Sequence, residues 1–92
     1  MDKSEFILKI RPLFWSVSDS RLDIISDELF VETVLNYGRL EDVQTLFGLL
    51  GLEKVSTIFR KGAIQRERTN YLPQVKNYYT LYFDKYAPGD TK

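Results

Sequence analysis

The residues of this sequence that could do chemistry are mostly basic, and they gather toward its C-terminus. Lysine and arginine side chains contact nucleic-acid phosphates, and nearby amide side chains hydrogen-bond to bases or to the backbone. Between positions 60 and 76 the only acidic residue is Glu67. The candidate nucleic-acid-binding residues lie in this stretch or directly after it: Arg60, Lys61, Arg66, Arg68, Gln74, Lys76 and Asn77. A solvated loop with scattered positive charge has the same composition, so both interpretations stay open.

The sequence offers little for catalysis. It contains no histidine and no cysteine, so the commonest general base, the thiolate nucleophile and the commonest zinc ligands are missing. The acidic pairs Asp27-Glu28 and Glu41-Asp42 are adjacent in sequence, and neighbours on a helix point about 100° apart, so neither pair converges on one substrate atom. Both pairs are typical of helix N-termini. We therefore expect a non-enzymatic protein with no catalytic residue, no metal site and no cofactor.

Length and composition limit the elements that must position these residues. The 92 residues, of which 43% are hydrophobic and 28% charged, predict one small globular domain over 1–92. The net charge is zero, but residues 1–59 hold six Lys/Arg and ten Asp/Glu, whereas residues 60–92 hold seven and three. The basic part could therefore meet nucleic acid, an acidic protein, or the acidic part of a second copy.

Apolar residues recur at helical spacing, which predicts an all-α domain of about five short helices. Ser4 and Ser26 are the expected N-caps of the first two helices, and Pro73 is expected in the first turn of the last. The predicted helices cover 4–10, 26–37, 40–50, 52–61 and 73 to about 87. The core of the domain is expected over about 4–87, with a frayed tail over 88–92.

The segments between these helices also carry signals. Gly38, Gly51 and Gly62 are expected just past helix ends, because glycine takes the left-handed conformation there without a steric penalty. Residues 63–72 are polar and predict a loop. Gly51 joins two helices with almost no linker, which indicates an αα-hairpin or, as an alternative, a DNA-reading helix-turn-helix. An irregular apolar plug against the helices is predicted from Leu13, Phe14, Trp15 and Val17, and Asp19 could cap one helical turn after it.

Aromatic residues dominate the last predicted helix. On a helical wheel they fall, with Val75, inside an arc of roughly 140°, which predicts a mostly buried face. The residues of this arc are Val75, Tyr78, Tyr79, Tyr82, Phe83 and Tyr86. Tyr71 precedes the helix and lies outside the pattern, so we expect it to be exposed and name it as the candidate partner-binding residue.

No apolar run of the sequence is long enough to predict an export signal or a membrane span. The apolar triplet at 6–8 is too short for a signal-peptide core, and the longest weakly polar run, 43–52, is about half of a membrane span. We therefore expect a cytoplasmic protein with no membrane partner.

Three stretches of the sequence resemble a family of small, largely uncharacterised bacterial proteins: "PLFWSV" at 12–17, "VLNYGRLEDVQTLFGLLGLEKV" at 34–55 and "LPQVKNYYTLYF" at 72–83. The recognisable positions are Trp15, Tyr37, Gly38, Asn77 and Tyr78. Genes of that family often lie beside nucleotidyltransferase-type toxins of abortive-infection systems. The resemblance implies an antitoxin or accessory protein of a toxin–antitoxin pair that binds its toxin, promoter DNA, or both. A DNA-binding transcriptional regulator and a homodimeric scaffold are the alternatives.

Overall fold

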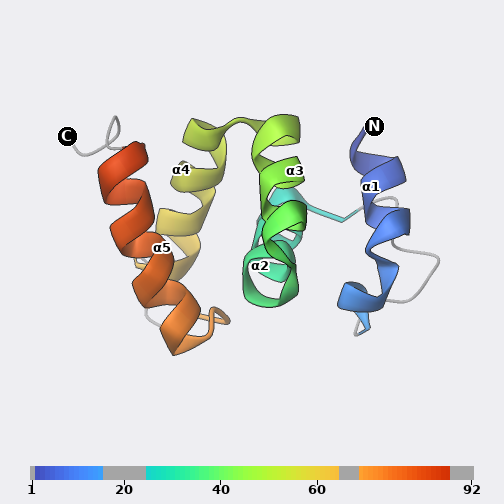
Figure 1. Cartoon of the computed structure of the whole chain (residues 1–92). Helices are drawn as coiled ribbons and strands as arrows, with labels where there is room; N and C mark the ends of the chain where they lie inside the picture. The colour runs from blue at the N-terminus through green and yellow to red at the C-terminus, as the bar shows by residue number, and fades with distance from the viewer. Residues whose placement is uncertain (1, 16–24, 65–68, 88–92) are drawn as a thin grey trace.

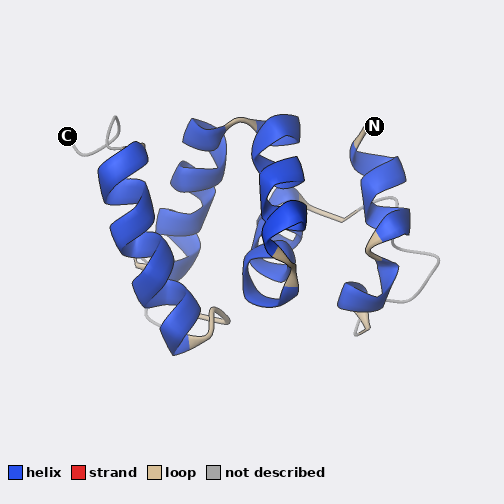
Figure 2. Cartoon of the chain, viewed as in Figure 1, coloured by secondary structure: helices blue, strands red, loops and turns tan. Residues whose placement is uncertain are grey.

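The computed structural model describes residues 2–15, 25–64 and 69–87, and every regular element in these ranges is helical (Figure 2). The all-α prediction is therefore confirmed. In chain order the elements are α1 (Lys3–Lys9), the 3-10 helix η1 (Arg11–Phe14), α2 (Asp27–Tyr37), α3 (Leu40–Leu50), α4 (Leu52–Ala63) and α5 (Pro73–Tyr86). In Figure 1, α1 lies at one end of the bundle and α5 at the other.

Local capping signals explain where the first two α-helices begin. The Ser26 hydroxyl accepts a hydrogen bond from the Leu29 amide at 3.2 Å, so the predicted N-cap of α2 is confirmed. The prediction of Ser4 as N-cap is wrong, because α1 starts earlier. The Asp2 carboxylate accepts from the Glu5 amide at 2.9 Å, and the Glu5 carboxylate accepts from the Asp2 amide at 3.0 Å. This reciprocal pair satisfies two amides of the first turn.

The three glycines serve different purposes. Gly51 has φ 90° and joins α3 to α4 in the left-handed region, as predicted. Gly38 follows α2, but its φ is −77°, and close packing accounts for it instead: a Cβ there would lie 2.6 Å from the Val34 carbonyl oxygen. Gly62 was predicted past the end of α4 and lies inside its last turn, where a Cβ would meet the Tyr71 ring at 3.2 Å.

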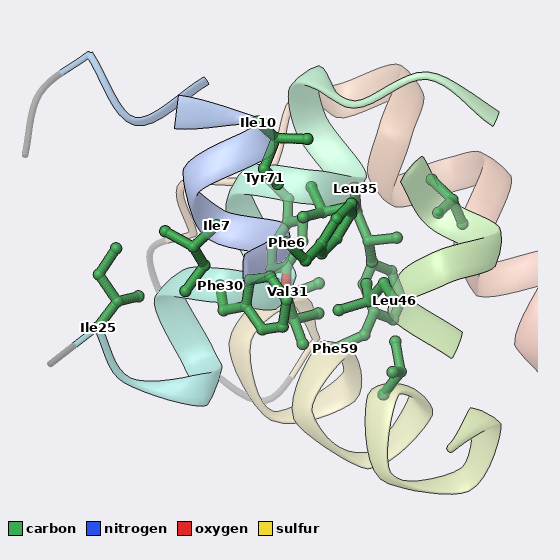
Figure 3. Close-up of a cluster of buried hydrophobic side chains, with 14 of the residues drawn as sticks. Phe6, Ile7, Ile10, Ile25, Phe30, Val31, Leu35, Leu46, Phe59 and Tyr71 are labelled. Atoms are coloured by element: carbon green, nitrogen blue, oxygen red, sulfur yellow. The ribbon is translucent and has the colours of Figure 1, made fainter. Parts of the chain in front are cut away.

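The core forms around α2, which contacts η1, α3 and α4. Its Phe30, Val31 and Val34 side chains are fully buried. Phe6 of α1 meets Phe30 edge-on with ring centroids 5.9 Å apart, and Phe59 of α4 enters the same cluster (Figure 3). Burying apolar side chains from several helices in this way is the main stabilising contribution to the fold.

The last helix packs on one side only. The buried Phe83 lies 5.3 Å from the Phe59 ring and 6.0 Å from the Phe47 ring, so α4 and α3 cover this side of α5. The wheel prediction was wrong for Tyr78, at one edge of the arc, and for Tyr86, near its middle, because they are 57% and 54% exposed. No described helix covers the outer side of α5, which is why Tyr78 stays in solvent, and Tyr86 is the last residue of the helix.

Asp27 joins three helices electrostatically. Its carboxylate lies 2.9 Å from the Lys3 ammonium of α1 and 3.0 Å from the Lys54 ammonium of α4, and Lys3 also donates to the Ile25 carbonyl. The hydrogen bonds from Lys3 and then from Lys54 hold the pKa of Asp27 below its ordinary value of 3.8.

Asp27→Asn should therefore lower the free energy of unfolding at pH 7 by about 1 kcal/mol. Because the folded-state pKa lies below the unfolded-state value, the ion pairs stabilise the fold above about pH 4, and this contribution is lost as pH falls through the folded-state pKa. Urea unfolding at pH 7 and pH 2 measures the effect. The difference between wild type and variant should shrink at pH 2, and an undiminished difference there would contradict the account.

Candidate functional site

A cleft of about 260 Å³ opens between the α1–η1 segment and the start of α3. Its apolar wall comes from Ile10, Pro12 and Leu13, and Ile10 is buried. Lysine, arginine and acidic side chains complete it, so the cleft combines apolar surface with charges of both signs. The charged lining residues are Lys9, Arg39, Glu41 and Asp42.

Local sequence explains how both walls form. Pro12 stands in the first turn of η1, where its fixed φ suits a helical start, and the Leu13 amide donates to the Ile10 carbonyl at 2.9 Å. On the other wall, the Asp42 carboxylate accepts from the Arg39 amide at 2.9 Å and caps α3. Asp42 is therefore held in place, whereas Glu41 is exposed beside it.

Large apolar side chains stand exposed next to the lining residues in the chain. Trp15 directly follows η1 and is 78% exposed, and Leu40 lies between Arg39 and Glu41 and is 72% exposed. The predicted plug is correct for Phe14, which is buried, and wrong for Trp15. Successive residues of a 3-10 turn point about 120° apart, so burying Phe14 turns Trp15 outward. Val17 and Asp19 lie outside the described residues.

Two of the stretches that carry the family resemblance meet at this cleft. The stretch 12–17 supplies Pro12 and Leu13, and the stretch 34–55 supplies Arg39, Glu41 and Asp42. The sequence did not predict that these two stretches would share one surface. Leu40, a leucine at the start of a helix beside two acidic residues, was the signal from which the sequence could have predicted a binding surface here.

The candidate nucleic-acid residue Arg60 has internal partners. Its guanidinium donates to the Ser56 hydroxyl at 2.6 Å, to the Ala87 carbonyl at 3.1 Å and to the Asp84 carboxylate at 3.3 Å. Only 14% of the Arg60 side chain is exposed. The positive charge therefore lies at the C-terminal end of α5, where it complements the helix dipole, and it joins α4 to α5.

The other candidate basic and amide residues do not form one described surface. Lys61, Gln74 and Asn77 are exposed, and Lys76 is half-buried. At about 100° per residue, Gln74 and Asn77 share one side of α5 and Lys76 lies on another. Arg66 and Arg68 lie outside the described residues. DNA binding by this region stays a prediction.

Tyr71 is buried, so the expectation that it is exposed was wrong. Only 5% of it is accessible, its ring meets Phe59 edge-on at 5.1 Å, and burial raises its pKa. The Asn36 side chain of α2 explains the position: it donates to the Asn70 carbonyl at 3.1 Å and accepts from the Leu72 amide at 3.0 Å. These two bonds fold the segment before α5 against the core.

Comparison with protein-family models, with curated proteins and with solved structures found no match to this chain. Among residues 2–15, 25–64 and 69–87, no group of three or more acidic side chains could hold a metal ion. None of the helices described is both long enough and apolar enough to cross a bilayer. The functional proposal therefore rests on the geometry of the cleft and on the resemblance in sequence.

Proposed function

We propose that this chain is a non-enzymatic protein-binding module whose partner docks on the cleft face, defined as the lining residues together with Trp15 and Leu40. The supporting observation is the position of Trp15, which is 78% exposed at the end of the turn that lines the cleft. An exposed tryptophan has a large apolar ring and a single donor, and such residues dominate the energy of many protein interfaces.

The sequence resemblance suggests the class of partner. We propose a nucleotidyltransferase-type toxin encoded beside this chain, with the chain as its antitoxin or accessory protein. The mixed lining suits a protein surface better than a single ion, because Lys9 and Arg39 stand with Glu41 around an apolar floor. Charge pairs at the rim of an interface set orientation and association rate, while the apolar centre supplies affinity.

Trp15→Ala and Leu40→Ala should each weaken binding to the protein encoded beside this chain, by roughly 30-fold for Trp15 and roughly 10-fold for Leu40. Isothermal titration calorimetry measures the affinities, and co-expression reports whether toxicity is relieved. Ile64→Ala is the control for Leu40→Ala, because Ile64 is an apolar residue that is 49% exposed and follows α4, away from the lining residues. Equal affinities for wild type and both cleft variants would overturn this assignment of the cleft.

A further inference from the structure

The outer side of α5 carries an exposed stripe that nothing in the described fold covers. Four exposed residues follow one another at spacings of four, three and four: Gln74, Tyr78, Leu81 and Lys85. This is the spacing of the contact seam in antiparallel helix pairs and coiled coils. At about 100° per residue the four fall within an arc of roughly 60°. We call this set the α5 stripe.

Ring contacts on the neighbouring side hold Tyr78, one of the four residues of the α5 stripe. The Tyr82 ring stacks on Tyr78 with centroids 6.1 Å apart and on Phe47 of α3 at 5.9 Å. Tyr82 also contacts Tyr86 at 4.8 Å. Tyr78 is therefore tied through Tyr82 to the core, so little side-chain entropy remains to be lost when a partner covers it.

The order of residues in the α5 stripe suits a second copy running the opposite way. In an antiparallel pair, Tyr78 of each copy faces Leu81 of the other copy, and Gln74 of each copy faces Lys85 of the other. A parallel arrangement would instead place Lys85 against Lys85, which costs energy because like charges repel. The antiparallel order thus pairs apolar with apolar at the centre and neutral amide with ammonium at both ends.

The residues that flank the α5 stripe agree with this arrangement. On one side stand Asn77 and Asp84, and in the antiparallel order the Asn77 amide of one copy faces the Asp84 carboxylate of the other. The Asp84 side chain is 60% exposed, so it keeps room for a second hydrogen bond beside Arg60. On the other side stand Val75 and Tyr82, which are half-buried and apolar. An amide donor thus meets a carboxylate acceptor on one flank, and apolar groups meet on the other.

We propose that the α5 stripe is a homodimerisation surface, on which the α5 helices of two copies pack antiparallel about a two-fold axis passing between Tyr78 and Leu81. A 14-residue helix is about 21 Å long, so the interface falls at the small end of the range for specific complexes. The expected dissociation constant is therefore roughly 10 to 100 µM.

Sedimentation equilibrium from about 5 to 500 µM tests the association. The wild type should pass from monomer to dimer across this range. Leu81→Glu should remain monomeric, because it places a carboxylate in the apolar centre, and circular dichroism should show an unchanged helix content. Leu8→Glu is the matched control, since Leu8 of α1 is 63% exposed, close to the 64% of Leu81, and lies outside α5, so this variant should dimerise like the wild type. A wild type that stays monomeric at 500 µM would overturn the proposal.

Cysteine cross-linking tests the antiparallel order, and the chain is suited to it because it has no cysteine of its own. Gln74→Cys alone and Lys85→Cys alone should form few disulfide-linked dimers under mild oxidation. An equimolar mixture of the two should cross-link strongly, because residue 74 of one copy faces residue 85 of the other. Efficient cross-linking of Gln74→Cys with itself would overturn the antiparallel order.

These tests separate dimerisation from the proposed function. Leu81→Glu should abolish dimers and leave the cleft face of each monomer free to bind its partner. Leu40→Ala should weaken partner binding and leave dimers intact. If the α5 variants change partner affinity and never change mass, the α5 stripe binds the partner rather than a second copy, and the dimer proposal is overturned.

Discussion

Phe59→Ala should lower the free energy of unfolding by about 3–5 kcal/mol. Phe59 is completely buried, and its ring meets Tyr71, Tyr79 and Phe83 with centroids 5.1, 6.3 and 5.3 Å away. Removing the ring leaves a cavity at the point where α4, α5 and the segment before α5 converge. Since domains of this size are stable by about 5–15 kcal/mol, the variant should be close to unfolding at physiological temperature.

Urea denaturation followed by circular dichroism measures this loss. Tyr78→Ala is the control, because it also removes an aromatic ring from this region, but one that is 57% exposed, and it should cost less than about 1 kcal/mol. Equal losses for the two variants would show that Phe59 does not occupy the centre of the core.

Arg60→Met should lower the free energy of unfolding by about 2–3 kcal/mol, because hydrogen bonds to charged groups contribute more than neutral ones. The substitution keeps an unbranched apolar stem and removes the guanidinium that joins Ser56 of α4 to Asp84 and Ala87 at the end of α5. The C-terminal end of α5 would then lose its cationic partner, so faster amide hydrogen exchange is expected in its last turn.

Lys61→Met is the matched control for Arg60→Met. Lys61 is the next residue of α4 and is exposed, so its loss should change stability by less than about 0.5 kcal/mol. If both variants lost the same stability, the internal role of Arg60 would be contradicted. If both retained full stability and weakened binding to duplex DNA equally, Arg60 would belong with Lys61 on a phosphate-binding surface.

Helix positions were readable from the sequence where the signals are local. Ser26 as a cap and Gly51 as a left-handed joint place α2, α3 and the start of α4 as predicted. The reciprocal cap of Asp2 and Glu5 is equally local and marks the start of α1. The rule that glycine marks a helix end fails at Gly62. The close approach of the Tyr71 ring accounts for the glycine at this position.

Contacts between residues far apart in sequence decide which side chains are exposed. No local pattern in the sequence predicts these contacts. Tyr71 is buried because Asn36, more than thirty positions earlier, binds the backbone on either side of it. The Arg60 guanidinium donates a hydrogen bond at 3.1 Å to the carbonyl of Ala87, which lies 27 positions later in sequence. The two walls of the cleft likewise meet only in three dimensions, so the sequence could not show that Leu13 and Arg39 line one cleft.

The central claim, that a protein partner docks on the cleft face, is tested most directly by amide chemical-shift mapping of the isotope-labelled chain during titration with the protein encoded beside it. The account predicts the largest shifts at residues 9–15 and 39–42, and their loss in Trp15→Ala. Shifts confined to α4 and α5, or a saturating excess of partner that leaves residues 9–15 and 39–42 unmoved, would contradict it.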